Sequence, residues 1–269
     1  MDTYISDIAV FLPNQPIEND EMEVMLGQVN GIPSRTRKII LRNNGIKKRY
    51  YALDPKTGKA THTNAQLVAE AIKKLKPYAG FKLDDLELLA CGTSSPDQLL
   101  PGHALMVHGE LANNRAVETV STSGICLSGI TALKYVAMSV ASGASKNGVA
   151  TGSETASSYM KAGMFQGMAK APKLDESTEL APYFSFEADF LRWMLSDGAA
   201  ACFVTSTPDP KKLNLRIDWI DILSQAHRKE TCMFSGSVKN PDGTIKGYRA
   251  FDSIPDAVAG GAFPVKQDA

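Results

Sequence analysis

The chain has 269 residues, of which 43% are hydrophobic and 22% charged, a composition that fits a globular protein and excludes a largely disordered one. Its formal net charge of +0 provides no overall field that would attract nucleic acid or an anionic membrane. No stretch reaches the ~18 apolar residues of a membrane span and the N-terminus is acidic, so we expect a cytoplasmic protein that binds neither nucleic acid nor membranes.

The first half of the chain predicts strands and helices in alternation. Residues 4–12 alternate between apolar and polar and end before Pro13, which is typical of a strand. Thr61 or Thr63 is expected to cap a helix that runs to Leu75. The apolar run LELLACGTS predicts a strand buried on both faces, and the helix-like HALMVHGELA follows it.

The second half continues this alternation. AVETVSTS predicts a strand that leads directly into a buried helix, CLSGITALKYVAMSVASGAS. Three further strands are predicted in NGVATGSETAS, SDGAAACFVTS and LRIDWIDIL. Such an order of elements favours a layered α/β fold.

The four cysteines are widely separated and include no CxxC pair and no Cys/His cluster with metal-ligand spacing. We therefore expect reduced thiols and no metal site. Cys91 and Cys202 lie in apolar runs, where a free cysteine serves as a small buried hydrophobe. Cys232 also lacks the setting of a site.

Cys126 differs from the other cysteines because it lies where a strand-like run meets a helical run. The unpaired N–H groups and the dipole at a helix N-terminus stabilise a thiolate. Gly124, Gly129 and small neighbours leave room for a substrate to approach. The residues alone leave open both a nucleophile and a buried small hydrophobe at this position.

Four segments resemble β-ketoacyl-acyl-carrier-protein synthase III, a member of the thiolase superfamily. STSGICLSGITAL is similar to the family's nucleophile loop, with Ala132 and Leu133 at the family's spacing from the cysteine. CGTSSPDQLLPGHA, ATGSET and LSDGAAACFV resemble three other family segments and occur in the family's order. Ser128 and Gly129, however, give Cys-x-Ser-Gly in place of Cys-x-Gly-Phe, a pattern closer to that of thiolases.

The resemblance implies a thiolase-like α-β-α-β-α fold built from a duplicated βαβαβ unit. Residues 1–205 would form the N-terminal repeat that carries the nucleophile, with an irregular insert at 155–190. Residues 206–269 would begin the C-terminal repeat, so we expect the sequence to be a fragment of a longer protein. A half fold would expose a sheet edge and helix faces.

The resemblance also implies how substrates bind. GIKKRYYA is similar to a family motif at the pocket mouth, where coenzyme A or carrier phosphopantetheine enters, so Arg42, Lys47 and Arg49 are candidate phosphate contacts. The alternative is a solvated basic face. Leu100 falls where the family has a residue that crosses a homodimer interface, although a lone leucine is more often part of the core. No bound cofactor is implied.

The family's acid-base partners, a His and an Asn, lie in a C-terminal half that this sequence does not contain. None of the four histidines matches the family motif: His62, His103, His108 and His227. A partly buried, hydrogen-bonded histidine is the preferred interpretation of His103 and His108.

The implied reaction transfers an acyl group to Cys126, after which malonyl-acyl carrier protein undergoes a decarboxylative Claisen condensation, as in fatty acid or polyketide biosynthesis. Acyl-coenzyme A and acyl carrier protein would be the partners. One alternative is a thiolase or a non-decarboxylating acyltransferase of the same superfamily. Another is a non-catalytic partner subunit that shapes an acyl chamber, although such subunits usually lack the cysteine. No cysteine peptidase motif occurs.

Overall fold

The computed structural model describes residues 1–165 and 190–267. Internal contacts divide the chain into two compact units, each formed from three stretches of sequence. The first comprises Met1–Asn14, Thr61–Thr155 and Asp197–Leu223, and the second comprises Gln15–Ala60, Ala156–Ser196 and Ser224–Ala269. The predicted repeats, 1–205 and 206–269, are continuous stretches of sequence, whereas these units are discontinuous. The two divisions therefore cannot be compared, and the repeats stay a prediction. Most of the predicted insert at 155–190 lies outside the described residues.

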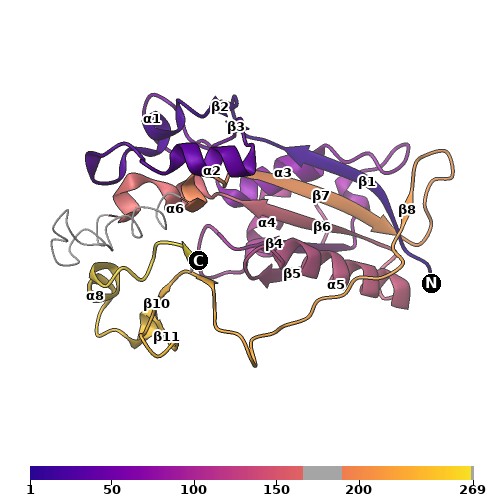
Figure 1. Ribbon diagram of the computed structural model, residues 1–269. Helices are drawn as coiled ribbons and strands as arrows, with labels where there is room; N and C mark the ends of the chain where they lie inside the picture. The colour runs from indigo at the N-terminus through magenta and orange to yellow at the C-terminus, as the bar shows by residue number, and fades with distance from the viewer. Residues whose placement is uncertain (166–189, 268–269) are drawn as a thin grey trace. The chain divides into compact units, whose positions relative to one another are not determined.

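The first unit contains a single mixed sheet and three α-helices (Figure 1). Its strands are β1 (Tyr4–Phe11), β4 (Leu88–Thr93), β5 (Glu118–Ser123), β6 (Asn147–Glu154), β7 (Gly198–Thr205) and β8 (Leu215–Arg216). Its helices are α3 (Asn64–Lys73), η2 (Leu83–Asp85), α4 (His103–Leu111) and α5 (Ser128–Ser142).

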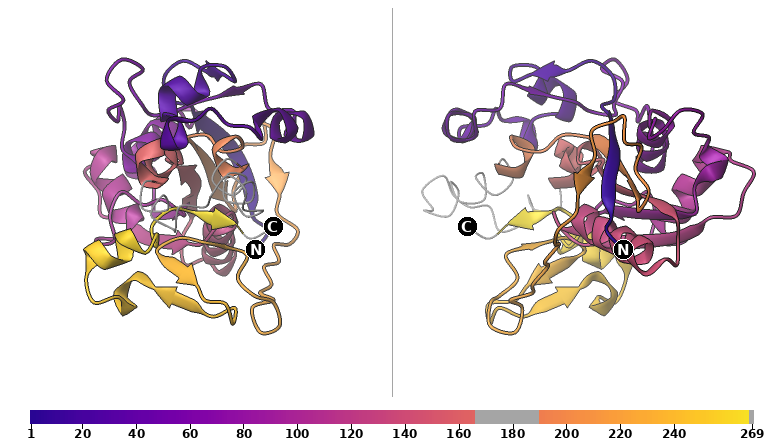
Figure 2. Two further views of the ribbon diagram at one scale, coloured as in Figure 1. Left: turned by 60° about the vertical axis from the view of Figure 1, so that its left-hand side comes forward. Right: turned by 90° about the vertical axis from the view of Figure 1, so that its right-hand side faces the viewer.

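The sheet has the strand order β5-β4-β6-β7-β1-β8. Parallel pairing joins β4 to β5 and to β6, whereas β7 runs antiparallel to β6 and to β1. α5 packs on one face of the sheet, and α3 and α4 pack together on the other face. Figure 2 (right) shows this unit from the end at which β1 begins. This α-β-α layering confirms the predicted α/β class.

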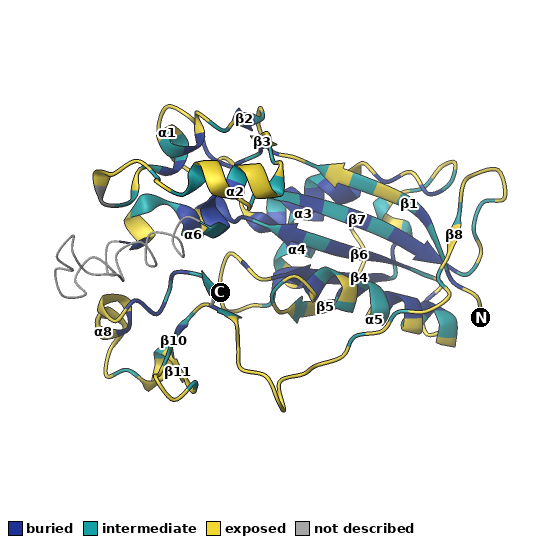
Figure 3. Ribbon diagram, viewed as in Figure 1, coloured by how far each residue is buried: buried dark blue, intermediate teal, exposed yellow. Residues whose placement is uncertain are grey.

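Burial explains why β4 reads as an apolar run. All six of its residues are buried, because helices cover both faces of the central strands (Figure 3). On the α5 side the core contains residues from the sheet and from one stripe of the helix: Leu88, Ala90, Ala132, Val136, Val140, Ala150 and Val204. α3 begins where predicted, because Thr63 and Gln66 form a capping box.

α5 differs from the fully buried helix that its apolar sequence predicts. Ala132, Val136 and Val140 face the sheet, but Tyr135 and Met138 on the remaining surface are 38% and 62% exposed. The helix also begins at Ser128, two residues after Cys126. Its second apolar face is thus uncovered in the unit as described.

The prediction of a long strand in LRIDWIDIL is wrong in extent. Only Leu215 and Arg216 pair with β1, and the Ile217 N–H then donates to the Thr3 carbonyl. Residues 218–223 have no regular structure, because in the described residues no neighbouring strand pairs with them. Trp219 is consequently 81% exposed.

The second unit consists of short elements. Its strands pair as β2 (Ile17–Glu18) with β3 (Lys48–Arg49), β9 (Met233–Phe234) with β12 (Lys266–Gln267), and β10 (Ser237–Lys239) with β11 (Ile245–Gly247). Its helices are α1 (Met22–Leu26), η1 (Val29–Gly31), α2 (Arg37–Asn44), α6 (Ser157–Met160), η4 (Tyr248–Ala250) and α8 (Ile254–Ala259). The core gathers around the buried Trp193, with Met22, Leu26, Tyr51 and Met160.

Candidate active site

Cys126 lies in a tight turn between β5 and α5. Its φ angle is +61°, a left-handed conformation that is uncommon for a residue with a side chain. The Leu127 N–H donates to the Ile125 carbonyl over 2.7 Å, so a three-residue turn closes around the cysteine. Gly124, with φ at +139°, lets the chain leave β5 for this turn. The thiol is consequently exposed just before the N-terminus of α5.

The start of α5 rests directly on the backbone of the sheet. A Cβ atom placed on Gly92 of β4 would be 2.3 Å from the carbonyl carbon and oxygen of Ser128. Gly129 faces Gly152 of β6 at a somewhat longer distance, since a Cβ on Gly129 would lie 3.1 Å from the Gly152 Cα. These glycines allow a helix-to-sheet approach that fixes the height of the Cys126 turn above the strands.

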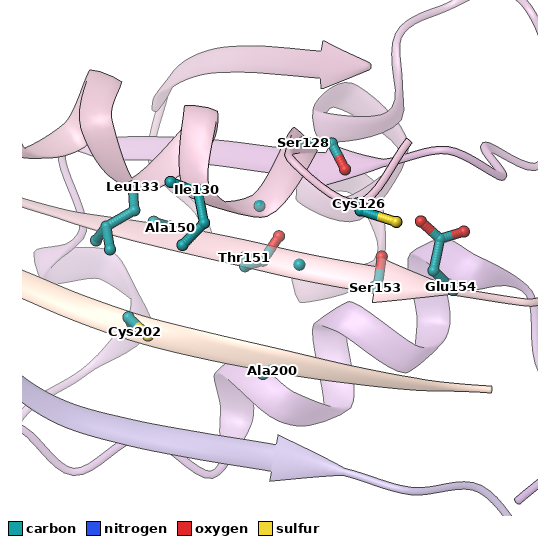
Figure 4. A pocket seen from close by; sticks show the side chains of 12 residues that line it. Cys126, Ser128, Ile130, Leu133, Ala150, Thr151, Ser153, Glu154, Ala200 and Cys202 are labelled. Carbon is teal, nitrogen blue, oxygen red and sulfur yellow. The ribbon is translucent and has the colours of Figure 1, made fainter. Parts of the chain in front are cut away.

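A pocket of about 360 Å³ opens beside Cys126. Figure 4 shows the thiol and the Glu154 carboxylate at one end, with Leu133 and Cys202 toward the other. The residues that line it come from the turn, α5, β6 and β7: Cys126, Ser128, Gly129, Ile130, Leu133, Ala150, Thr151, Gly152, Ser153, Glu154, Ala200 and Cys202. The side chains between its ends are mostly small or apolar, so the pocket suits an alkyl group attached to the thiol.

Glu154 is a pocket residue that the sequence reasoning did not identify. Its Oε1 accepts hydrogen bonds from the Ser94 N–H at 2.8 Å and the Ser94 hydroxyl at 2.7 Å, and its Oε2 accepts one from the Ser95 hydroxyl at 2.6 Å. The signal was present, because Glu154 lies in the ATGSET segment and Ser94 and Ser95 lie in CGTSSPD. Charge-assisted bonds of this kind are strong, so the carboxylate ties the two segments together at the pocket.

The loop after β4 is held from its other side by α3. Asp97 accepts hydrogen bonds from the N–H groups of Asn64 and Ala65, the first two residues of that helix. The buried Asn64 amide donates in turn to the Thr93 hydroxyl and the Ser95 carbonyl. The loop whose serines hold the Glu154 carboxylate is therefore anchored to α3 as well as to the end of β6.

His103 is a buried, hydrogen-bonded histidine, which confirms its preferred interpretation. The residue is 4% exposed and its Nε2 lies 3.3 Å from the Ser153 hydroxyl. In the described part of the chain its Nδ1 has no hydrogen-bond partner. Burial lowers the pKa of His103, and the nearby Asp97 opposes this shift only in part.

Buried His103 is expected to make stability depend on pH. Its folded-state pKa is lowered, so the unfolded chain takes up a proton first as the pH falls below about 6.5, and folding free energy is lost there. Urea unfolding between about pH 8 and pH 5.5 should show a larger loss of stability for the wild type than for His103→Gln, which cannot titrate. Identical pH profiles for the two proteins would contradict this assignment.

The structure separates the four thiols by their surroundings. Burial raises the pKa of Cys91 to about 12, against an opposing contribution from the Thr151 hydroxyl. Burial also raises the pKa of Cys202, which is partly exposed. Cys126 and Cys232 are exposed. The expectation that Cys91 is an inert core residue agrees with this environment.

These environments predict an order of alkylation. Iodoacetamide added to the native protein at about pH 8 should modify Cys126 and Cys232 rapidly, because the reagent reacts with accessible thiolates. Cys91 should stay unmodified until the protein is unfolded, since almost all of it is protonated and it is enclosed. Peptide mass mapping measures the order, and native Cys91 reacting as fast as Cys126 would refute it.

The three candidate phosphate contacts lie in the second unit and differ in exposure. Arg42, at the end of α2, and Lys47 are exposed. Arg49 is only 1% exposed, and its guanidinium donates to the Asn19 side chain and to the Trp193 carbonyl. Burial lowers the pKa of Arg49. The neighbourhood of GIKKRYYA is therefore partly core, and of the three candidates only Arg42 and Lys47 reach solvent.

Leu100 lies in the loop between β4 and α4, where it is 82% exposed, and its neighbour Leu99 is 70% exposed. It is not a core residue of the first unit.

Within the described ranges, no group of three His, Cys, Asp or Glu residues could hold a metal ion. No helix among these residues is long and apolar enough to cross a membrane.

Comparison with known proteins finds a curated relative over part of the chain. The chain is 29% identical over 157 residues to β-ketoacyl-[acyl-carrier-protein] synthase III of Streptococcus pneumoniae strain Hungary19A-6, a match that covers 57% of this chain and 43% of the relative. The chain thus spans less than half the length of this relative. No protein-family model matches the chain.

Solved structures show the same fold. FabH, a 3-oxoacyl-(acyl carrier protein) synthase III from Pseudomonas aeruginosa PAO1, matches with a TM-score of 0.62 and 16% identity, over 92% of this chain and 64% of that one. The tetronic acid condensing enzyme AbyA1 matches with a TM-score of 0.59 and 20% identity, over 78% and 56%. A variant of OleA from Xanthomonas campestris gives 0.57 and 20%, over 76% and 56%.

The α-β-α unit, with a cysteine turn above its sheet, has the thiolase-like fold of these enzymes. The chain is therefore similar to β-ketoacyl-acyl-carrier-protein synthase III in sequence over 157 residues and in fold over most of its length.

Proposed function

We propose that the protein is an acyl-transferring condensing enzyme of the β-ketoacyl-acyl-carrier-protein synthase III type, with Cys126 as the nucleophile. The observation that carries the proposal is the turn itself, which holds an exposed cysteine at φ +61° before α5 and beside a pocket lined mostly by small and apolar residues. A strained backbone at an accessible thiol is typical of a site kept for chemistry. A residue that only filled space would not need this conformation.

In the proposed first step the Cys126 thiolate attacks the carbonyl carbon of an acyl thioester. A new S–C bond forms, the donor thiolate leaves, and the acyl group remains on the enzyme as a thioester that retains the energy of the donor. Backbone N–H groups stabilise the negative charge on the tetrahedral oxygen. The Leu127 N–H is already donated to Ile125, whereas the Cys126 N–H has no acceptor among the described residues and is available for this role.

In the second step a malonyl group on acyl carrier protein would lose carbon dioxide and attack the acyl-enzyme. The acyl donor would be a coenzyme A or phosphopantetheine thioester, with Arg42 and Lys47 as exposed cations for its phosphates. The relatives named above support this choice of carrier. A role in fatty acid or polyketide biosynthesis, the homodimer with Leu100 at its interface, the cytoplasmic location and the absence of a bound cofactor stay predictions.

A turnover assay tests the proposal. The protein is given acetyl-coenzyme A or octanoyl-coenzyme A together with malonyl-acyl carrier protein, and carbon dioxide and β-ketoacyl product are measured. Release of both in equal amounts, lost in Cys126→Ala, is expected. Carbon dioxide release without any condensed product in the wild type would count against the condensing role.

The second candidate is a thiolase or a non-decarboxylating acyltransferase. Two observations favour it: the Cys-x-Ser-Gly pattern at Cys126, and the Glu154 carboxylate at the same end of the pocket, which would repel the carboxylate of a malonyl donor. This candidate predicts acylation of Cys126 without loss of carbon dioxide. A non-catalytic subunit predicts neither.

A further inference from the structure

The turn that carries Cys126 is closed at its base by a hydrogen bond across the chain. The hydroxyl of Thr122, near the end of β5, donates to the carbonyl of Ser128, the first residue of α5, over 2.7 Å. Thr122 precedes the turn and Ser128 follows it, six residues later. Cys126 lies inside the loop that this bond closes.

The same end of α5 contacts three neighbouring strands. Thr122 of β5 pairs in register with Gly92 of β4, and both touch Ser128. Gly152 of β6 faces Gly129. The glycine contacts limit how close the helix lies to the sheet, but van der Waals contacts are not directional. The hydroxyl of Thr122 is directional, because a hydrogen bond needs a defined donor position at the carbonyl.

We propose that Thr122 is a positioning residue for Cys126, and that its hydroxyl clamps the turn so that the thiol and the N–H of Cys126 face the acyl carbonyl together. This inference rests on the proposed function, since it concerns the rate of acylation. Errors of about 1 Å in the placement of reacting groups can reduce rates on the order of 100-fold. A strained turn without its clamp has an easy way to relax, which would move the thiol.

Three variants separate positioning from plain stabilisation. Thr122→Val removes the hydroxyl and keeps the shape, and Thr122→Ser keeps the hydroxyl. Thr205→Val is the matched control, because Thr205 also donates from a strand to a backbone carbonyl, that of Lys146, over 3.2 Å at the other end of the sheet. Each protein is examined for its thermal unfolding midpoint and for single-turnover acylation by acetyl-coenzyme A and octanoyl-coenzyme A.

Thr122→Val is expected to lower the limiting acylation rate by about 10- to 100-fold, with the half-saturating thioester concentration unchanged. Thr122→Ser should restore most of this rate, and Thr205→Val should lose stability without losing rate. Wild-type acylation rates in Thr122→Val, or equal losses in Thr122→Val and Thr205→Val, would overturn the proposal.

Alkylation by iodoacetamide distinguishes this inference from the proposed function. If neither thioester acylates the wild-type protein, the proposed function fails, and the clamp is judged by alkylation of Cys126 alone. A slower reaction of Thr122→Val than of Thr205→Val would then support the clamp. Equal alkylation rates in the two variants would overturn it.

Discussion

Gly92→Ala is expected to destabilise the first unit by about 3 kcal/mol or more and to disorder the start of α5. The new methyl group would lie 2.3 Å from the Ser128 backbone, and a backbone carbonyl cannot rotate away as a flexible side chain can. Either α5 lifts off the sheet or β4 bends, and both responses move the Cys126 turn. Urea unfolding measures the loss, and the alkylation rate of Cys126 reports the displacement.

Gly109→Ala is the matched control for this change. Gly109 lies within α4, and a Cβ there meets nothing within 4 Å. Alanine has the higher helix propensity, so this variant should be as stable as the wild type or more stable by up to about 1 kcal/mol. Similar losses in the two variants would show that Gly92 is not a special contact.

Cys126→Gly is expected to be inactive and yet more stable than Cys126→Ala by about 1 kcal/mol. Both variants lack the thiol, so acyl transfer should fall on the order of 1,000-fold or more. Glycine adopts φ near +61° without the steric cost that any Cβ incurs there. Activity assays and urea unfolding of the two variants provide the comparison.

The activity and the stability of these variants test two separate claims, that Cys126 is the nucleophile and that its backbone is strained. If Cys126→Ala transferred acyl groups at the wild-type rate, the cysteine would not be the nucleophile. If Cys126→Gly were less stable than Cys126→Ala, the turn would not store strain at residue 126. Higher stability of Cys126→Gly than of Cys126→Ala, with both variants inactive, is the result expected where the backbone conformation at residue 126 disfavours any Cβ atom.

The sequence predicted those elements whose burial or capping is visible in their own residues. β4 is apolar throughout because helices cover both of its faces, and Thr63 with Gln66 forms the cap that starts α3. The strand order followed from none of these patterns. β7 lies between β6 and β1, and this placement depends on contacts between residues far apart in sequence.

Two predictions failed because they assumed neighbours that the described units lack. Residues 218–223 have the composition of a strand but no adjacent strand to pair with, and Trp219 is left exposed. α5 is apolar on two faces, whereas the sheet covers only one, so Met138 is 62% exposed. Apolar sequence shows which residues gain by burial and does not supply the surface that buries them.

The site was predictable to the extent that it is local. Gly124, Cys126 and Gly129 are close in sequence, and the strand-to-helix junction indicated an exposed turn. Glu154 was not identified, since its place beside Cys126 depends on the pairing of β6 with β4. The burial of Arg49 against Trp193 was equally beyond sequence reasoning, because charged residues are rarely buried unless partners far along the chain satisfy them.

The most direct test of the account is the mass of the protein after brief exposure to acetyl-coenzyme A and to octanoyl-coenzyme A. The account predicts one acyl group per chain, found by peptide mapping on Cys126, sensitive to hydroxylamine as a thioester is, and absent from Cys126→Ala. Cys232 is the internal control, because it is also exposed but lies outside the proposed site. An adduct that persists in Cys126→Ala, or no adduct in the wild type, would contradict the account.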